Sequence, residues 1–357
     1  MHETVSFYKG KKVLVTGHTG FKGTWLCKIL IMAGAEVTGY ALEAPTNPSL
    51  FALSGIEKNM NSVIGDVRDL EHLKQVFEEV QPEIVFHLAA QPIVRESYKN
   101  PVYTYETNVM GTVNVLECIR LTPSVKSFVN VTTDKVYRNN EWERGYREED
   151  VLNGYDPYSN SKSCSELVTD SYKKSFFADG RVAISTARAG NVIGGGDFAV
   201  DRIIPDCIRA AADGKEIIVR NPYSVRPYQH VLEPLFVYLM IARKQMENAE
   251  YAGNYNVGPD DVDCLTTGAL VTLFCDAWVK QTGQKISWVN KSDGGPHEAG
   301  FLKLDCTKIK RTFCWRPRWN AATAMEKIVE WASVYYNHGD VSACMEQQIK
   351  EFEEKAF

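Results

Sequence analysis

Short apolar runs rich in β-branched residues alternate with helical patterns along the first half of the chain. Each run predicts a strand, and the runs cover residues 13–15, 37–42, 62–65, 84–89 and 127–132. After the first run, apolar residues from Phe21 to Leu30 recur at helical spacing, and residues 108–121 predict the helix before the fifth strand. Continuous apolar strands between helices are typical of a parallel sheet covered on both faces. The pattern therefore predicts an α/β fold with a doubly wound, Rossmann-type parallel sheet.

The rhythm changes after about Asn191, where three glycines at 194–196 interrupt the chain. Further helices are predicted at 202–212, 233–244, 266–281 and 321–337, with short strands at 216–220 and 254–257. The strand at 254–257 is expected to return to the main sheet. We therefore expect a dinucleotide-binding domain over 1–190, with later returns near 228–257. A smaller mixed α/β domain over 191–357 is expected mainly to bind substrate, with a cleft between the two.

Composition narrows the class of protein. The 357 residues are 44% hydrophobic and 24% charged, with a formal net charge of −5 and no dense Lys/Arg block, so nucleic acid is not expected as a partner. The nine cysteines form no C-x-x-C pair, and neither Cys nor His residues show metal-ligand spacing, so we expect reduced thiols and no metal. The N-terminus lacks the apolar segment of a signal peptide, and the longest apolar run, 235–242, is too short to span a bilayer. A cytoplasmic protein without a membrane partner is expected.

A glycine-rich segment follows the first strand and opens the first long helix. Thr16-Gly17-His18-Thr19-Gly20-Phe21-Lys22-Gly23 has glycines at G-x-x-G-x-x-G spacing. Gly17 permits a tight turn, Gly20 lets the backbone approach a pyrophosphate, and Gly23 allows close packing of helix and strand. The N–H groups at the start of the helix can then hold the phosphates. This context predicts a dinucleotide site.

The residues Tyr158 and Lys162 are four apart, so on a helix they share one face. We expect the Lys162 ammonium to lower the pKa of the Tyr158 phenol, which can then take a proton from a substrate alcohol as a hydride leaves. Thr133, at the end of the fifth strand, can hydrogen-bond the same oxygen. The pattern predicts oxidation of an alcohol by a nicotinamide cofactor.

In this order, these motifs resemble the extended short-chain dehydrogenase/reductase family. Asp66-Val67 ends the third strand, His87-Leu-Ala-Ala-Gln91 ends the fourth, and Asn108 opens the helix before the fifth. The resemblance implies a cofactor site made of Gly17, Thr19, Gly20, Phe21, Lys22, Gly23, Asp66, Val67, Leu88, Ala89, Ala90, Gln91, Asn108, Tyr158 and Lys162.

One position departs from the usual pattern for binding the adenosine ribose. An acidic residue often ends the second strand, but here the strand reads Tyr40-Ala41-Leu42-Glu43, which places Glu43 late. No Arg stands there to meet a 2′-phosphate, so NAD is favoured over NADP.

The segment Thr133-Asp134-Lys135-Val136-Tyr137 resembles the Thr-Asp-Glu-Val-Tyr run of the nucleotide-sugar 4,6-dehydratases. The resemblance implies that Asp134 protonates the leaving C6 hydroxyl and that a neutral Lys135, in place of the usual Glu, removes the C5 proton. Thr133, Tyr158 and Lys162 complete the catalytic set. Lys135 and the run 20–26 resemble the corresponding residues of the branch that acts on CDP-glucose. The resemblance implies a role in deoxysugar biosynthesis for surface polysaccharide such as O-antigen.

The same resemblance implies phosphate contacts from Asn191, Arg202 and Arg226, and a homodimer or dimer of dimers through helices at 101–121 and 158–178. Three alternatives stay open: a nucleotide-sugar C4 epimerase, a 4,6-dehydratase acting on a dTDP- or GDP-sugar, and a nucleotide-binding regulator without activity. Lys135 could also be a structural residue held in a salt bridge.

Overall fold

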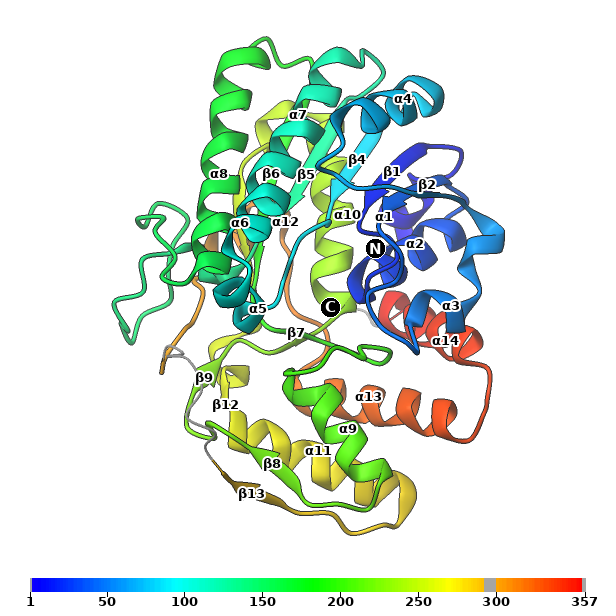
Figure 1. The fold of residues 1–357 in the computed structure, drawn as a ribbon, viewed down its shortest axis with the longest axis vertical. Coiled ribbons are helices and arrows are strands. Elements are labelled where there is room, and N and C mark those ends of the chain that lie inside the picture. Colours follow the sequence, from blue (N-terminus) through cyan, green and yellow to red (C-terminus); the bar gives the residue numbers. More distant parts are fainter. Residues whose placement is uncertain (1, 292–299, 355–357) are drawn as a thin grey trace.

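The computed structural model describes residues 2–291 and 300–354. Its centre is a seven-stranded sheet in the order β11-β6-β5-β4-β1-β2-β3, in which every pair of neighbours is parallel (Figure 1). The strands are β1 (Lys12–Thr16), β2 (Glu36–Ala41), β3 (Asn61–Ile64), β4 (Ile84–His87), β5 (Ser127–Val131), β6 (Ala183–Ala189) and β11 (Asn254–Val257). The predicted Rossmann-type parallel sheet is confirmed.

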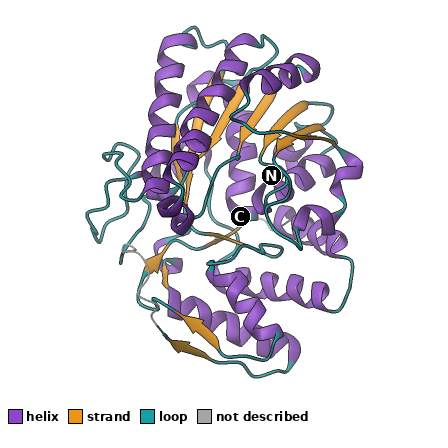
Figure 2. Cartoon of the chain, viewed as in Figure 1, coloured by secondary structure: helices purple, strands orange, loops and turns teal. Residues whose placement is uncertain are grey.

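Helices cover both faces of this sheet (Figure 2). Because successive side chains of a strand point to opposite faces, Val13 and Val15 of β1 enter one core and Leu14 enters the other. The first core is shared with α2 (Phe21–Met32) and α10 (Leu232–Glu247), and the second with α4 (Leu70–Val80) and α7 (Gly111–Leu121). Burial on both faces explains why these strands read as unbroken apolar runs.

The strand order reverses at β1, which lies between β2 and β4. In an open α/β sheet, ligands bind in the crevice outside the carboxyl ends of the strands at this switch point. The glycine segment after β1 and residues 88–91 after β4 both lie there, because Leu88 N–H bonds the Thr16 carbonyl beside the end of β1.

A third core is formed by elements that lie below the sheet in Figure 1. It is built mainly from α9 (Ile203–Ala212), α11 (Thr267–Thr282) and α13 (Ala321–Tyr336), with β8 (Ile217–Val219) beside them. Three two-stranded sheets join β8 with β13 (Trp288–Asn290), β7 (Val192–Ile193) with β10 (Gln229–His230), and β9 (Val225–Arg226) with β12 (Leu265–Thr266). The helices expected at 202–212, 233–244, 266–281 and 321–337 are all present.

Parts of the second half return to the main sheet. β11 pairs with β6, as predicted for 254–257, and α10 packs on β5 and β6. The C-terminal helix α14 (Val341–Glu354) contacts α2 and α3. The remaining elements are α1 (His2–Ser6), α3 (Leu50–Ser54), η1 (Ile56–Asn59), α5 (Val94–Lys99), α6 (Pro101–Tyr105), η2 (Glu106–Met110), η3 (Asp134–Val136), α8 (Pro157–Phe176), η4 (Ala249–Tyr251), η5 (Asp261–Asp263) and α12 (Thr307–Phe313).

Two sequence-based assignments need correction. Asn108 does not open a helix, because it lies inside η2, a π-helical segment that joins α6 to α7. Strand β6 has no counterpart among the predicted strands, since the polar residues Ser185, Thr186 and Arg188 interrupt its apolar pattern although all three are buried.

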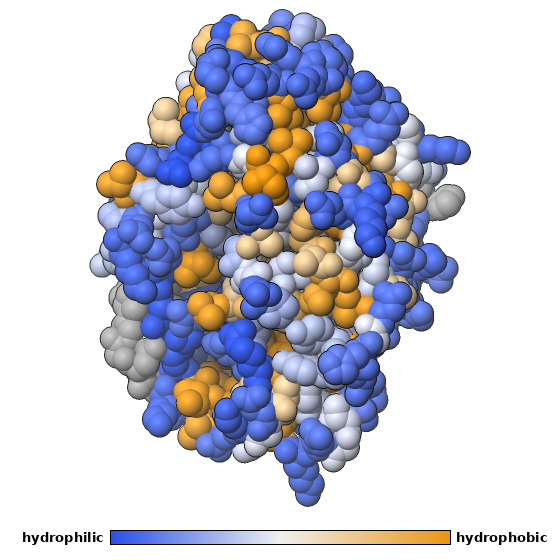
Figure 3. All heavy atoms as spheres, turned by 45° about the vertical axis from the view of Figure 1, so that its right-hand side comes forward, coloured by the Kyte–Doolittle hydropathy of each residue, from blue (hydrophilic) through white to orange (hydrophobic). Residues whose placement is uncertain are grey.

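Several general features concern the molecule as a whole. None of the nine cysteines forms a disulfide. Within residues 2–291 and 300–354, no helix has the length and apolar character needed to cross a membrane. On the face drawn in Figure 3, hydrophilic residues predominate, and an apolar strip lies in the upper part.

Candidate active site

A cavity of about 1330 Å³ opens at the switch point of the sheet. Its lining runs from the glycine segment and Asp66 at one end to β8 and Asn221 at the other. Every residue predicted for the cofactor, the substrate or the chemistry lines this cavity except Asn108. The structure therefore brings the three predicted groups of residues into one site.

Two glycines of the segment, Gly17 and Gly23, approach their neighbours too closely for a side chain. Gly17 has φ of +78°, and a Cβ atom there would lie 2.7 Å from the Ala89 nitrogen. A Cβ atom on Gly23 would lie 2.1 Å from the Gly17 carbonyl oxygen. Gly20 is the N-cap of α2 and supplies no side-chain cap. The first N–H groups of α2 thus meet the cavity without a side-chain acceptor, as an anion site requires.

Asn108 lies one layer behind the cavity and orders its wall. Its Oδ1 accepts from the Gln91 backbone N–H at 2.8 Å, and its Nδ2 donates to the Gln91 carbonyl at 3.1 Å. The same Nδ2 donates to Ser161 Oγ on α8 at 2.9 Å. Asn108 therefore acts through Gln91 rather than by lining the site itself. Single π-helical turns inside helices are frequent at functional sites.

Two acidic residues predicted or considered for the cofactor, Asp66 and Glu43, differ in their contacts. Asp66 is ion-paired with Arg68, with 2.6 Å between Oδ2 and Nη2. Glu43 lies two residues beyond the end of β2 and lines the cavity. Its position past the strand end is the late placement that the sequence indicates.

Helix α8 presents Tyr158 and Lys162 to the cavity. The helix begins at Pro157, and Asp156 caps it by accepting from the Ser159 N–H at 2.9 Å. Both side chains are buried, and Lys162 Nζ donates to the Val131 carbonyl at the end of β5, at 3.2 Å. Lys162 is thereby fixed between its own helix and the sheet.

The expected lowering of the tyrosine pKa is wrong for the free protein. Burial raises the pKa of Tyr158 to about 12, although a hydrogen bond with Thr133 and the charge of Arg202 act in the opposite direction. Burial also lowers the pKa of Lys162 to about 8, against the influence of Glu166. The sequence shows the i, i+4 spacing but not the depth of the pocket, and depth decides both shifts.

The turn after β5 carries Thr133, Asp134 and Lys135. Thr133 Oγ1 donates to Asp134 Oδ1 at 2.9 Å, and the Asp134 side chain is only 1% exposed. Asp134 Oδ2 is buried without a hydrogen-bond partner among the described residues. Lys135 Nζ lies 3.9 Å from Asp134 Oδ1, and its side chain is 31% exposed. A buried carboxyl group and a more accessible amine thus face one cavity side by side.

Three residues predicted to hold the phosphates line the part of the cavity beyond Tyr158. Asn191 follows β6, Arg202 is the N-cap of α9, and Arg226 lies on β9. Arg202 Nη1 pairs with Asp197 Oδ2 at 2.8 Å, and Arg226 Nη1 donates to the Val225 carbonyl at 2.9 Å. These contacts hold two guanidinium groups at the wall.

Lys22 brings a further cation into this region. Burial lowers the pKa of Lys22 to about 7, and the charges of Lys162 and Arg202 lower it further. Its Nζ donates to the Tyr238 hydroxyl on α10 at 3.2 Å.

A buried ion pair beneath the site was missed by the sequence reasoning. Arg188 of β6 and Glu166 of α8 are each 1% exposed, with 2.9 Å between Nη2 and Oε2. Thr132 and Thr186 donate to the two oxygens of Glu166 at 2.5 and 2.7 Å. One signal was available: Glu166 follows Lys162 by the same four residues that separate Lys162 from Tyr158.

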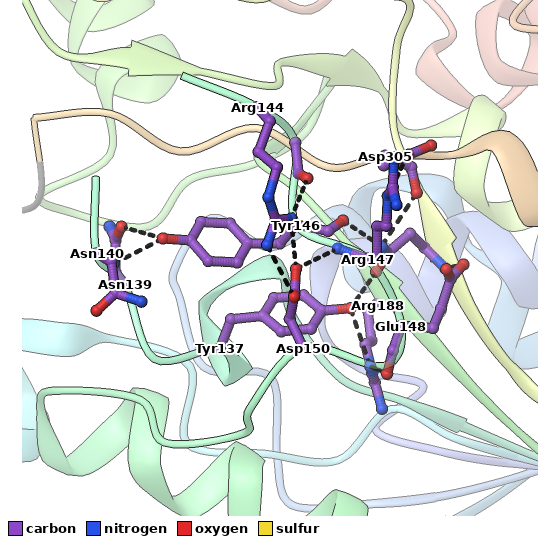
Figure 4. Close-up of polar contacts among 12 residues, drawn as sticks. Tyr137, Asn139, Asn140, Arg144, Tyr146, Arg147, Glu148, Asp150, Arg188 and Asp305 are labelled. Atoms are coloured by element: carbon purple, nitrogen blue, oxygen red, sulfur yellow. Dashed lines mark hydrogen bonds and ion pairs between the residues drawn. The ribbon is translucent and has the colours of Figure 1, made fainter. Parts of the chain in front are cut away.

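The same arginine fixes the segment that follows the turn after β5 (Figure 4). Arg188 Nη1 donates to the Tyr137 hydroxyl at 2.9 Å and to the Glu148 carbonyl at 3.0 Å. The Tyr137 hydroxyl donates to Asn256 Oδ1 on β11 at 2.6 Å, and its ring stacks on Tyr146 at 5.3 Å. Tyr137 and Glu148 are thus tied to the neighbouring strands β6 and β11.

Comparison with known proteins places these features in a family. The chain matches the family model described as GDP-mannose 4,6 dehydratase over residues 14–328. A CDP-glucose 4,6-dehydratase of Salmonella typhimurium is 46% identical over 353 residues, which are 97% of each chain.

Solved structures share the fold. A dTDP-glucose 4,6-dehydratase from Bacillus anthracis in complex with NAD has a TM-score of 0.75 at 22% identity, covering 92% of this chain and 99% of that one. A UDP-glucose 4-epimerase from Thermus thermophilus in complex with NAD has a TM-score of 0.77 at 23% identity, covering 90% and 98%.

Proposed function

Because this chain belongs to the nucleotide-sugar 4,6-dehydratases of the extended short-chain dehydrogenase/reductase family, we propose that it converts CDP-D-glucose to CDP-4-dehydro-6-deoxy-D-glucose and water. One observation carries the proposal: Asp134 and Lys135 share a single cavity with Tyr158 and Lys162. Oxidation of the alcohol alone needs only Tyr158 and Lys162. The adjacent carboxyl and amine supply an acid and a base for elimination. The substrate follows from the Salmonella relative, whose name specifies CDP-glucose.

NAD is the cofactor we propose. The site fits a dinucleotide whose pyrophosphate lies against backbone N–H groups. It offers the glycine segment, the N-terminus of α2 without a side-chain cap, and a cavity wall that includes Ala89. Both solved neighbours named above are NAD complexes. When bound, NAD accepts a hydride from C4 of the sugar and returns it to C6.

Each catalytic side chain has a distinct task in this proposal. Tyr158 takes the proton of the C4 hydroxyl as a phenolate, after its own proton has passed to solvent, and Thr133 hydrogen-bonds the phenolic oxygen. Lys162 is held beside it by its contact with the Val131 carbonyl. The 4-ketone acidifies the C5 proton, which Lys135 removes. Asp134 gives a proton to the C6 oxygen as water leaves.

The decisive experiment incubates the protein with CDP-, dTDP- and GDP-sugars, each with and without added NAD. A 4-keto-6-deoxy product absorbs strongly in alkali, whereas the product of a C4 epimerase does not. We expect this absorbance with CDP-glucose and without added reductant. Epimerised sugar without the absorbance would favour the epimerase, and no turnover of any sugar would favour a binding protein.

We also propose that two copies associate through α6, α7 and α8. Large apolar side chains are exposed on these elements and the segments next to them: Tyr98, Val102, Tyr105, Met110, Leu121, Leu167 and Phe176. A helical face of this kind is a candidate interface. Light scattering after gel filtration should give a dimer mass, and Leu167→Asp should reduce it to that of a monomer.

A further inference from the structure

The lining of the cavity indicates where the nucleoside of the substrate lies. Tyr158 and Asp134, which are assigned to the reacting sugar, lie on α8 and on the turn after β5, whereas α9 and β8, which line the same cavity, lie below the main sheet in Figure 1. Arg226 and Asn191 line the wall beyond them. A nucleoside attached through the diphosphate must then extend away from the cofactor end, toward α9 and β8. This step rests on the proposed function.

Two oppositely charged side chains meet at that end. Asp206 lies in the first turn of α9, and Arg220 directly follows β8; both line the cavity. Arg220 Nη1 is held by Asp201 Oδ1 at 2.8 Å, whereas its Nη2 lies 3.5 Å from Asp206 Oδ2. Arg209 contacts the other oxygen of Asp206.

The Asp206 carboxylate is held in place, and its side chain is 33% exposed. Arg209 and Arg220 hold it from two elements, while burial raises its pKa. The contact of Oδ2 with Arg220 is longer than a good charge-assisted hydrogen bond. That oxygen therefore gains from an additional N–H donor delivered through the cavity.

Cytosine offers the complementary pattern. Its 4-amino group donates, while N3 and O2 accept; uracil and thymine carry an acceptor at C4 and a donor at N3. We infer that Asp206 and Arg220 read the base, with Asp206 Oδ2 accepting from the 4-amino group and the Arg220 guanidinium donating to N3 and O2. Uracil and thymine would set their C4 oxygen against the carboxylate and N3–H against the guanidinium, which selects against them.

The test is a cycle that changes the protein and the ligand together. Binding of CDP, of UDP and of the diphosphate of the pyrimidin-2-one riboside, which lacks the 4-amino group, is measured by calorimetry on the NAD-loaded protein. For the wild type we expect CDP to bind about 10- to 100-fold more tightly than the analogue without the amino group. In Asp206→Ala this ratio should fall to about one, because the acceptor is gone.

Asp213→Ala is the matched control, because Asp213 lies at the other end of α9 and pairs with the exposed Lys215. It should keep the wild-type ratio. Equal binding of CDP and of the analogue without the amino group by the wild type would overturn the inference whether or not any variant folds. An unchanged ratio in a folded Asp206→Ala would overturn it too.

Failure of the inference and of the proposed function are distinguishable. If the wild type makes 4-keto sugar from CDP-glucose but shows no coupling between Asp206 and the amino group, only the inference about base recognition is wrong. A wild type that does not turn over CDP-glucose loses the proposed substrate.

Discussion

At the scale of single residues, burial is the main influence on the Tyr158 and Lys162 groups of the site. It raises the pKa of Tyr158 to about 12 and lowers that of Lys162 to about 8, so both neutral forms gain. The Tyr158 phenol is therefore protonated in the free protein at neutral pH. The phenol therefore has to lose its proton in the loaded site, where the substrate hydroxyl and the Thr133 hydroxyl can hydrogen-bond its oxygen.

Replacing Tyr158 by Phe tests the first step. The variant loses only the phenolic oxygen, so we expect turnover to fall by at least about 10²- to 10⁴-fold while CDP binding stays close to that of the wild type. Formation of 4-keto sugar and calorimetric CDP binding are the two measurements. Tyr223→Phe, at an exposed tyrosine outside the cavity lining, is the control. Normal rates in the Tyr158 variant would remove this residue from the mechanism.

The second step is tested at Lys135. Because Lys135 is assigned only to removal of the C5 proton, and Tyr158 and Lys162 to the oxidation, Lys135→Ala should still oxidise C4 but should exchange the C5 proton slowly. A lost general base costs about 10²- to 10⁴-fold in rate. Substrate is mixed with the variant in D₂O, and deuterium at C5 is followed together with the nicotinamide absorbance. Deuterium entry and water release at the normal rate would make Lys135 a structural residue.

At the scale of elements, the Arg188–Glu166 pair joins β6, α8 and the turn after β5. Arg188→Met should lower the free energy of unfolding by about 3–5 kcal/mol, because it leaves the Glu166 carboxylate buried without its cation. Glu166→Gln combined with Arg188→Met should recover part of that loss. Urea unfolding measures both.

Lys174→Met supplies the comparison on the same helix. Lys174 pairs with Asp170 at 2.7 Å on the surface of α8. An exposed pair contributes only about 0–1 kcal/mol. Equal losses in the Arg188 and Lys174 variants would argue against a structural role for the buried pair.

Local sequence patterns were sufficient where one element carries the whole signal. The glycine segment, the Tyr158–Lys162 spacing and the apolar strands β1 to β5 each depend on a few neighbouring residues. Strand β6 and Glu166 were not predicted, because their buried polar side chains are stabilised by partners far along the chain. Asn108 was identified but placed at a helix start, since sequence spacing does not distinguish a π-helical segment from an α-helix. The depth at which Tyr158 is buried, and hence the sign of its pKa shift, depends on the complete fold.

At the scale of the whole molecule, buried histidines make stability depend on pH. Burial lowers the pKa of His87 to about 3 and that of His230 to about 3, against an ordinary value of 6.5. Below pH 6.5 the unfolded chain binds protons that the folded protein does not, so stability present above that pH is lost toward pH 3. Each group contributes a slope of about 1.4 kcal/mol per pH unit.

Urea unfolding at a series of pH values measures this dependence. His87→Gln should give a shallower fall between pH 6 and 4, by about 1.4 kcal/mol per pH unit. His338→Gln, at an exposed residue following α13, should keep the wild-type slope. Parallel curves for wild type and the His87 variant would show that His87 is not responsible.

Overall stoichiometry supplies another prediction for the intact protein. Because the proposed reaction returns the hydride to the same sugar, product should form many times over on one bound NAD. Product and nicotinamide absorbance are followed together through at least ten turnovers. Reduced cofactor accumulating in step with product would contradict an internal redox cycle.

The return of β11 to the sheet bears on how such chains can be recombined. Residues 191–231, which carry Asp206, Arg220 and Arg226, lie between β6, a strand of the main sheet, and α10, which packs on that sheet. A single crossover within this segment would join β6 of one parent to the β11 of another and mismatch the edge of the sheet. An exchange of base preference between two parents therefore requires a double crossover that transfers the segment as an insert and leaves the sheet of the recipient whole.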